Sequence, residues 1–428
     1  MSAPLHVFDE AIRLGGPAAG GSCVGHAPDT TLFVRGGLPG ELVTVRATGS
    51  TRGGRITFAD VVEVIEASQH RVTPPCPLTG VCGGCDLQHV APSFQLEWKA
   101  QVLRDQLQRI GGIEAIVGVP LYQAVTVTRP TSAEGSNDAA TADDGALGWR
   151  TRVAVDADAA GRACFHAHRS DHLVPVAHCP VVVAELQAGF GHRWPSGQRV
   201  HLALGQGQPT ASAAGDDGRA PNGWRVAGTV TREAAGRRWR VAVDGFWQAH
   251  REAPDLLVAA VRRVLAPQPG ESVLDLYSGV GLFAGSLAGD VGASARVAAV
   301  EGDERAARLA RRNLHDLPGV RLHHGGVRRW LGSPVGREVL AGVDLVVLDP
   351  PRAGAGREVV AALAASSARA VAYVACDGAS LARDARLFHQ QGWSLASLAA
   401  FDLFGMSHHL EAVALFLPPD SELLPPTL

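Results

Sequence analysis

Val273-Leu-Asp-Leu-Tyr-Ser-Gly-Val-Gly281 is the stretch of the sequence that decides the fold. An apolar run that carries an acid and then turns through close glycines is typical of a buried parallel strand ending beside a ligand, because glycine lets the backbone approach where a Cβ atom would obstruct it. About twenty residues later the apolar run 297–300 ends at Glu301, where nucleotide-binding α/β sheets hold a ribose by its hydroxyl groups. The two runs together indicate an adenosine site.

The glycine spacing alone does not separate such a site from an ordinary tight turn, because the third glycine of the G-x-G-x-x-G pattern is absent. Two further apolar runs favour the nucleotide site. Residues 343–348 end at the turn Asp349-Pro-Pro-Arg352, and residues 370–375 end at Cys376. Tandem prolines stiffen the backbone and remove hydrogen-bond donors, so this turn is expected to line a cleft. Four strand ends are therefore expected to converge on one crevice at the edge of a sheet.

The composition limits the class of protein. With 428 residues, of which 46% are hydrophobic, the chain is long enough for two or three domains. No apolar stretch has the length of a membrane span and the N-terminus has no signal-peptide pattern, so we expect a soluble cytoplasmic protein. We also expect a monomer. The formal net charge of −3 neither indicates nor excludes a nucleic-acid partner. Lys99 is the only lysine, so nearly all positive charge is arginine.

Residues 1–68 are expected to form a small β-barrel. Short β-type runs at 31–34, 42–45 and 60–65 are separated by turns rich in glycine and proline. This pattern is typical of an OB-like barrel, which often carries single-stranded nucleic acid. A barrel with a purely structural role is the alternative.

Three cysteines follow the barrel, Cys76, Cys82 and Cys85, within ten residues. In a cytosolic chain such a group is more often a set of metal ligands than a set of disulfide partners. A zinc knuckle, a 4Fe-4S cluster and unmetallated buried thiols are the alternatives. The paired glycines before Cys85 favour the cluster, because the backbone must pass close to a bulky inorganic core. The fourth ligand must come from elsewhere, and Cys179 is the first candidate and Cys164 the second.

Residues 69–250 are expected to form a β-rich central domain that carries the cysteine site, and residues 251–428 the α/β domain. The pattern predicts helices at 92–110 and 252–265, strands at 150–155 and 238–243, and surface loops at 131–147 and 205–222. Gln248 lies between aromatic residues at the second join. Its amide could reach a ligand or cap the following helix, and without further context the cap is favoured.

Two residues near the expected crevice carry chemistry. Cys376 could be a buried structural thiol, but its place at a strand end would let nearby arginines or helix N-termini stabilise a nucleophilic thiolate. Glu411 enters the apolar run 412–417. Packing explains a carboxylate poorly at this position, so Glu411 is a candidate general base.

The chain resembles the RNA 5-methyluridine methyltransferases that carry an N-terminal TRAM domain and an iron-sulfur cluster. The resemblance covers nearly the whole length. It is carried by Leu38-Pro-Gly-Glu41, the C-x5-C-G-G-C group at 76–85, Cys179-Pro180, Gln248, residues 275–281, Asp349-Pro-Pro-Arg352, Cys376 with Arg383-Asp384, and His409-x-Glu411.

The resemblance implies a Rossmann-like domain that binds S-adenosylmethionine and acts on RNA, with ribosomal RNA favoured over transfer RNA. It implies a nucleophile at Cys376 and a base at Glu411. Residues matching the cofactor site are Gln248, Tyr277, Glu301 and Asp349, beside the turn glycines Gly279 and Gly281. Residues matching the 4Fe-4S ligands are Cys76, Cys82, Cys85 and Cys179.

The implied mechanism is covalent. Carbon 5 of uracil is too electron-poor to attack a methyl sulfonium, so the thiolate first adds at carbon 6 and turns the ring into an enolate. Carbon 5 takes the methyl group, the base removes the carbon 5 proton, and the thiolate leaves. The target base must leave any stacked helix to reach the thiol.

Several positions depart from the family pattern. Asp377-Gly378 replaces Asn-Pro after the nucleophile, Gly405-Met406 replaces Pro-Gln, His250 replaces an asparagine, and Gly326 stands where an acidic or amide residue is usual. A carboxylate at 377 would raise the pKa of the neighbouring thiol. The departures leave two alternatives open: an RNA methyltransferase acting on another base or position, and an RNA-binding protein with a decayed active site.

Overall fold

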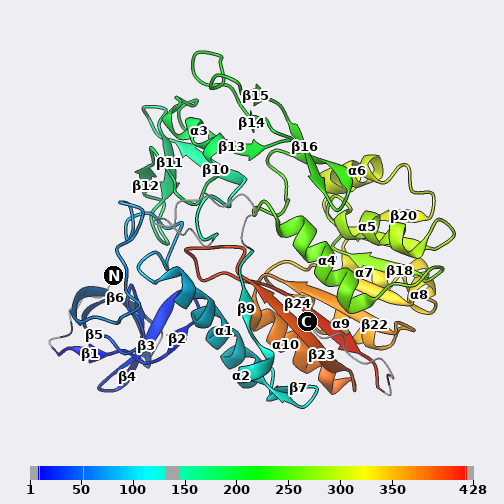
Figure 1. The fold of residues 1–428 in the computed structure, drawn as a ribbon, viewed down its shortest axis with the longest axis horizontal. Coiled ribbons are helices and arrows are strands. Elements are labelled where there is room, and N and C mark those ends of the chain that lie inside the picture. The colour runs from blue at the N-terminus through cyan, green and yellow to red at the C-terminus, as the bar shows by residue number, and fades with distance from the viewer. Residues whose placement is uncertain (1–7, 9, 52, 131–144, 420, 422–428) are drawn as a thin grey trace.

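The computed structural model describes residues 8, 10–51, 53–130, 145–419 and 421. Residues 131–144, most of the loop expected at 131–147, lie outside the described residues. The chain forms an N-terminal β unit, a central β unit and a C-terminal α/β unit, arranged around a common centre (Figure 1). Within the described part of the chain, no helix is both long enough and apolar enough to cross a membrane.

The N-terminal unit is a sheet with the order β1-β5-β6-β4-β3-β2. Its strands are β1 (Ile12–Arg13), β2 (Pro17–Ala18), β3 (Ser22–Ala27), β4 (Thr30–Arg35), β5 (Leu42–Ser50) and β6 (Ile56–Glu66). Just after β1 the backbone also bonds to β3, through Gly15 N to Val24 O at 2.7 Å and Val24 N to Gly16 O at 3.0 Å. Because the segment at β1 thus pairs on both sides, the sheet curls into the expected barrel.

The central unit is a sheet with the order β12-β11-β10-β13-β14-β15. Its elements are β10 (Arg152–Ala157), β11 (Ala163–His166), β12 (Leu173–Pro175), η1 (Ala184–Leu186), α3 (Ala188–Gly191), β13 (Arg199–Leu204), β14 (Pro209–Ala211) and β15 (Arg225–Val226). The expectation of a loop throughout 205–222 is wrong at β14, which pairs with β13. Buried Thr210 and Ala211 make this strand, and its small residues gave no apolar signal.

The C-terminal sheet has the order β20-β19-β18-β21-β22-β24-β23-β9. Its strands are β9 (Val127–Thr128), β18 (Val273–Leu276), β19 (Val297–Glu301), β20 (Val320–His324), β21 (Leu345–Leu348), β22 (Ala370–Ala375), β23 (Ser394–Phe401) and β24 (Glu411–Leu417). The strands from β20 to β22 are parallel, and β24 is antiparallel to both neighbours. The strand order reverses between β18 and β21, which confirms the expected Rossmann-like fold and its crevice.

Helices cover both faces of this sheet, because alternate strand residues point to opposite sides. The helices of this unit are α4 (Ala253–Leu265), α5 (Leu282–Val291), α6 (Glu304–Asn313), α7 (Val327–Leu331), α8 (Pro334–Leu340), α9 (Arg357–Ala364) and α10 (Gly378–Gln390). Val273 and Val347 belong to the core shared with α4, α5 and α6. Leu274 and Val346 belong to the core shared with α7, α9 and α10.

Parts of residues 69–250 pack on the C-terminal unit. They include α1 (Pro92–Arg109), β7 (Ala115–Ile116), β8 (Val119–Pro120), α2 (Leu121–Ala124), and the hairpin of β16 (Thr229–Ala234) and β17 (Arg237–Ala242). Helix α1 lies against α10 and β9 extends the sheet beyond β23, while Trp239 of the hairpin is fully buried in the core shared with α5. Trp98 of α1 packs in the barrel core, so this helix joins barrel and sheet.

Residues 402–410 connect β23 to β24, and we call this connection the strap. It projects toward the place where the three units meet (Figure 1). Glu411, the first residue of β24, follows it directly.

Candidate active site

The turn after β18 is shaped for a close approach to its backbone. Gly279 and Gly281 have φ angles of +56° and +97°, and Tyr277 has a φ of +61°, a left-handed conformation that costs a side-chain-bearing residue free energy. A Cβ atom at Gly279 would meet nothing within 4 Å, whereas one at Gly281 would lie 2.7 Å from Leu314 Cδ1. Gly279 therefore leaves open space beside the turn, and Gly281 lets α5 pack closely.

Glu301, at the end of β19, reaches this turn. Its Oε2 accepts a hydrogen bond from the backbone N of Gly279 at 2.7 Å, and its Oε1 accepts one from the backbone N of Asp303 at 2.6 Å. The structure thus brings the glycine turn and the acid of the second strand together, as a nucleotide site requires.

Two buried polar atoms beside the turn have no hydrogen-bond partner among the described residues. They are Asp275 Oδ1 and Ser278 Oγ. The other oxygen of Asp275 accepts a bond from Ala284 N at 2.8 Å. Burial raises the pKa of Asp275 well above its ordinary value, and the negative charges of Asp349 and Glu301 add to the effect. Because an unpaired buried polar atom costs about 1–3 kcal/mol, these atoms fit a site that a polar ligand completes.

Cys376 and Glu411 lie side by side. Strands β22 and β24 are antiparallel, and Ala375 lies opposite Ala412. Cys376, which follows Ala375, and Glu411, which precedes Ala412, therefore fall at the same edge of the sheet. Cys376 is half-buried and lines a cavity of about 140 Å³. Glu411 is 2% exposed, and its Oε1 has no hydrogen-bond partner among the described residues.

Burial and nearby negative charge both act on the Cys376 thiol. Burial is the main cause that raises its pKa to about 11, with further contributions from Glu411 and Asp349, and Arg352 opposes them. Burial raises the pKa of Asp349 to about 7 and that of Glu411 well above its ordinary value. A thiol and two carboxyl groups therefore compete for protons at one edge of the sheet.

The wall of the Cys376 cavity comes from three parts of the chain. It consists of Ala18, Ala19 and Gly20 of the barrel, Trp98, Val102 and Gln106 of α1, and Arg352, Asp377, Gly378, His408, His409 and Leu410 of the C-terminal unit. Arg352 Nη2 lies 3.3 Å from His409 Nε2. The barrel and α1 residues were not expected from the sequence, because they carry no local signal that they approach Cys376.

Asp377 begins helix α10. Its Oδ1 accepts a hydrogen bond from the backbone N of Ser380 at 2.7 Å. Aspartate and asparagine are about equally good at this helix position, so the departure from the family pattern preserves the start of the helix.

The structure explains the departure from the family pattern at Gly405, and it contradicts the favoured role of Gln248. A Cβ atom at Gly405 would lie 2.5 Å from the carbonyl oxygen of Ala146, so a residue larger than glycine does not fit at this point of the strap. The favoured role of Gln248 as a helix cap is wrong, because α4 has no side-chain cap. Gln248 is 7% exposed, and no hydrogen bond links its amide to another described residue.

Gly326 and His250 also depart from the family pattern, and only His250 has contacts that account for its side chain. Gly326 is the residue that precedes helix α7, and a Cβ atom there would meet nothing within 4 Å. His250 stacks on Trp149, and its Nδ1 accepts a bond from Glu252 N at 3.1 Å. Nothing in the structure explains the choice of glycine at 326.

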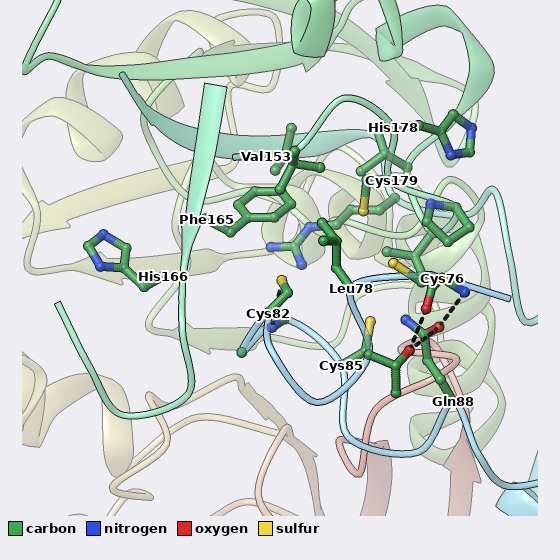
Figure 2. A pocket seen from close by; sticks show the side chains of 18 of the residues that line it. Cys76, Leu78, Cys82, Cys85, Gln88, Val153, Phe165, His166, His178 and Cys179 are labelled. Carbon is green, nitrogen blue, oxygen red and sulfur yellow. Dashed lines mark hydrogen bonds between the residues drawn. The ribbon is translucent and has the colours of Figure 1, made fainter. Parts of the chain in front are cut away.

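The cysteines form a second site. Cys76, Cys82, Cys85 and Cys179 line one cavity of about 280 Å³, whereas Cys164 is not among its lining residues (Figure 2). Burial raises the pKa of Cys85 to about 12, and the charge of Cys179 contributes to the rise. Among the described residues, no group of three or more His, Cys, Asp or Glu side chains is placed to hold a metal ion.

The same cavity has the chemistry that a larger thiolate-bound group requires. Arg150 lies in its wall, where a guanidinium offsets the charge of thiolates. The backbone N of Gly84 donates to Cys82 Sγ at 3.4 Å, and Gly83 packs tightly, since a Cβ atom there would lie 3.0 Å from His166 O. The four thiols therefore match a thiolate-bound group in type and line one cavity, but among the described residues they are not grouped closely enough to hold a metal ion.

The sheet order with a reversed strand β24, the glycine turn and the acid at the end of β19 define an S-adenosylmethionine-dependent methyltransferase of the Rossmann-like class.

Comparisons with known proteins agree with this class. An uncharacterized RNA methyltransferase of Streptomyces avermitilis is 39% identical over 437 residues, which cover 95% of this chain and 98% of that protein. The 23S rRNA (uracil(1939)-C(5))-methyltransferase RlmD of Alkalilimnicola ehrlichii is 31% identical over 443 residues, which cover 96% of this chain and 97% of that protein. The chain belongs to this family of RNA methyltransferases. No protein-family model matches it.

A solved structure supports the fold over the whole length. The Pyrococcus abyssi tRNA (uracil-54, C5)-methyltransferase in complex with S-adenosyl-L-homocysteine has a TM-score of 0.66 and 19% identity, and the match covers 95% of this chain and 99% of that chain. The similarity extends beyond the α/β unit to the two β units.

Proposed function

We propose that this protein transfers a methyl group from S-adenosylmethionine to carbon 5 of a uridine in ribosomal RNA, in the cytoplasm. The observation that carries the proposal is the pairing of half-buried Cys376 with buried Glu411 at the crevice of a methyltransferase sheet. The name of the 31% identical rRNA uracil-C5 enzyme supports the choice of base and of RNA.

The strand ends provide the proposed site for S-adenosylmethionine, which supplies a methyl group on a positively charged sulfur. The residues that would hold it are Gln248, Tyr277, Gly279, Gly281, Glu301 and Asp349. Glu301 already bonds to Gly279 N, so a ribose hydroxyl can replace or join this contact. The unpaired atoms of Asp275 and Ser278 support a polar ligand here.

In the proposed reaction, Cys376 Sγ adds as a thiolate to carbon 6 of the uracil ring. The electron pair of the carbon 5–carbon 6 double bond moves into an enolate, and carbon 5 becomes nucleophilic enough to take the methyl group. Arg352, which stabilises the thiolate form of Cys376, lies in the same cavity wall.

Glu411 completes the reaction as the proposed general base. It removes the proton from carbon 5, the electron pair re-forms the double bond, and the bond between Sγ and carbon 6 breaks. The raised pKa of Glu411 suits this role, because a more basic carboxylate is a better proton acceptor.

The RNA has to present an extruded base. The cavity at Cys376 measures about 140 Å³ and lies between the barrel, α1 and the C-terminal unit, so a base stacked in a helix cannot enter it. We assign the barrel a role in RNA binding, since its residues 18–20 line this cavity.

We also propose a 4Fe-4S cluster at Cys76, Cys82, Cys85 and Cys179, with a structural role.

The experiment is methyl transfer to unmodified 23S rRNA by wild type and Cys376→Ala. We expect the variant to lose methyl transfer by several orders of magnitude because no adduct can form, and to bind S-adenosylmethionine with unchanged affinity in calorimetry. Cys164→Ala is the matched control, since it removes a buried thiol that does not line the Cys376 cavity.

Wild-type activity in Cys376→Ala would favour a methyltransferase that acts on another base or position without covalent catalysis. Failure of the wild type to bind S-adenosylmethionine would favour an RNA-binding protein with a decayed active site.

A further inference from the structure

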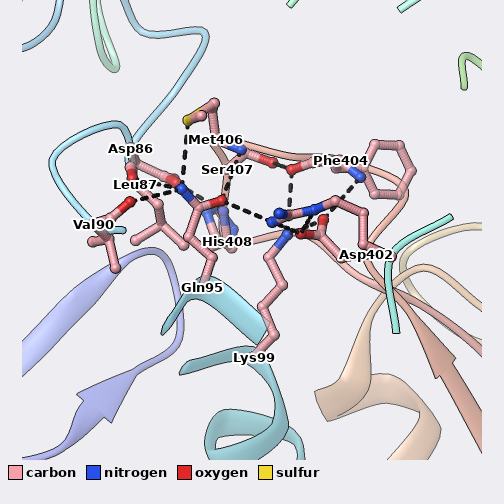
Figure 3. A network of polar contacts seen from close by, with 11 residues as sticks. Asp86, Leu87, Val90, Gln95, Lys99, Asp402, Phe404, Met406, Ser407 and His408 are labelled. Carbon is pink, nitrogen blue, oxygen red and sulfur yellow. Dashed lines mark hydrogen bonds and ion pairs between the residues drawn. The ribbon is translucent and has the colours of Figure 1, made fainter. Parts of the chain in front are cut away.

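The strap is held by a network of buried polar groups (Figure 3). At its start, Asp402 pairs with Lys99 of α1 and with Arg129, whose Nε lies 2.9 Å from Asp402 Oδ2. All three side chains are at most 9% exposed. Lys99, the only lysine of the chain, thus holds this end of the strap through its ion pair with Asp402.

The middle of the strap is bonded to α1 and to the cysteine loop, residues 76–90. Gln95 Oε1 accepts from Met406 N at 3.0 Å, and Gln95 Nε2 donates to Leu87 O at 3.1 Å and to Val90 O at 3.0 Å. The backbone N atoms of Asp86 and Leu87 both donate to Met406 O, at 3.2 Å and 3.0 Å. The cysteine loop and the strap therefore share a set of hydrogen bonds.

Asp86 makes the last of these links, at the end of the strap nearest the catalytic residues. Its Oδ1 accepts from His408 N at 2.8 Å, and its Oδ2 pairs with His408 Nδ1. The Asp86 side chain is 15% exposed. The ring of His408 lies 4.1 Å from that of His409, which contacts Arg352, and Glu411 follows two residues later.

Asp86 also touches the barrel turn that closes the Cys376 cavity. A Cβ atom at Gly21 would lie 2.7 Å from the Asp86 carboxyl carbon, so glycine is needed for the turn to approach. Its neighbours Ala18, Ala19 and Gly20 line the cavity. One carboxylate therefore stands between the barrel turn, the cysteine loop and the strap.

We propose that Asp86 is a positioning residue, which fixes His408 and His409 in the wall of the Cys376 cavity and thereby makes the cysteine loop part of the catalytic pocket. This inference rests on the function proposed above for that cavity. Asp86 touches neither reacting atom; it acts through the strap that leads to Glu411.

The test uses the full-length, iron-loaded protein and two readouts: kcat and KM for RNA methylation, and hydrogen exchange of the strap amides. Asp86→Ala removes both hydrogen bonds to His408, so it is expected to speed exchange in residues 402–410 and to lower kcat about tenfold, with iron content and S-adenosylmethionine affinity unchanged. Asp86→Asn keeps an acceptor for His408 N and is expected to stay within about twofold of wild type.

Asp156→Ala is the matched control, because Asp156 pairs with His166 at 3.0 Å in the central unit and does not touch the strap. Strap exchange and kcat like wild type in Asp86→Ala would overturn the proposal. Equal losses of kcat in the Ala and Asn variants would also overturn the proposal, because the charge of Asp86 and not its hydrogen bonds would then matter. Loss of iron in Asp86→Ala would overturn it as well.

A second variant leaves the Asp86 side chain in place. Gly21→Ala pushes on the carboxylate, whereas Gly40→Ala, at a similar φ of +82° against +70°, meets nothing within 4 Å. Faster strap exchange and lower kcat in Gly21→Ala alone support the proposal, and equal behaviour of the two variants contradicts it. An inactive wild type would refute the proposed function, while the exchange experiment would still test the position of the strap.

Discussion

At the scale of residues, the main feature is the opposition between the reactivity that Cys376 needs and the charges around it. Burial and the carboxylates of Glu411 and Asp349 raise the thiol pKa to about 11, against the effect of Arg352. At neutral pH the thiol of the free protein is therefore protonated. A positively charged donor sulfur beside Asp349 would lower the pKa of both groups, since opposite charge favours the ionised form. Under the proposed function, the nucleophile would then be activated only when the methyl donor is present.

This argument predicts how fast Cys376 reacts with iodoacetamide. A raised pKa means that the thiolate fraction, and hence the rate, increases as pH rises toward about 11. S-Adenosylmethionine should lower the midpoint by about 1 pH unit or more, and S-adenosylhomocysteine, which has no sulfonium charge, should lower it less. The Cys376 peptide is followed by mass spectrometry. Identical pH profiles with the two ligands would contradict the prediction.

At the scale of elements, the ends of β18, β21 and β24 carry carboxyl groups whose pKa values are all raised, at Asp275, Asp349 and Glu411. Holding these acids in one crevice costs free energy of folding whenever they ionise. The apolar cores on both faces of the sheet stabilise the fold and offset this cost. Functional sites commonly lower the stability of a fold in this way, because activity requires charged groups that packing alone would not place there.

Asp349→Asn should therefore stabilise the fold while it weakens the binding of S-adenosylmethionine. The pKa of Asp349 is raised from 3.8 to about 7, so the folded state binds its proton more tightly than the unfolded state does. The free energy by which the protonated Asp349 carboxyl group stabilises the wild-type fold is fully present below about pH 3.8. It is lost as pH rises through about 7. The Tm of the variant should exceed that of wild type at pH 8, by about 2–4 °C per kcal/mol, and the difference should shrink toward pH 4. A variant that is less stable at pH 8 would refute this.

The elements could be predicted where a local pattern reports burial. Apolar runs located β18, β19 and β22 because parallel strands covered on both faces are nearly all apolar, and amphipathic spacing located α1. Strand β14 was missed because its small residues carry no such pattern. The barrel turn at residues 18–20 and the strap enter the catalytic pocket only through packing between distant segments, and no local signal in the sequence reports that contact.

At the scale of the whole molecule, the strap lies where the three units meet. Its residues His408, His409 and Leu410 line the Cys376 cavity, and its Met406 accepts hydrogen bonds from the cysteine loop. The order of the units and their fold classes could be predicted from the sequence. The boundaries at 68 and 250 stay predictions, and α1, β9 and the hairpin of β16 and β17 pack on the C-terminal unit although they precede residue 250.

The proposed cluster predicts the metal content of the whole protein. Protein purified without oxygen should be brown and contain about four irons per chain, as expected for a 4Fe-4S centre. Cys179→Ser should lose this iron, whereas Cys164→Ser should keep it, because Cys164 does not line the cavity. Stoichiometric zinc in place of iron would refute the cluster.

Covalent capture of RNA tests the role of Cys376 most directly. In RNA that carries 5-fluorouridine at the target site, fluorine replaces the proton that Glu411 would remove, so the methylated adduct cannot release the thiol. With S-adenosylmethionine present, the wild type should form a stable protein–RNA complex that mass spectrometry maps to Cys376. Turnover without such a complex, or a link to any other residue, would contradict a thiolate attack by Cys376.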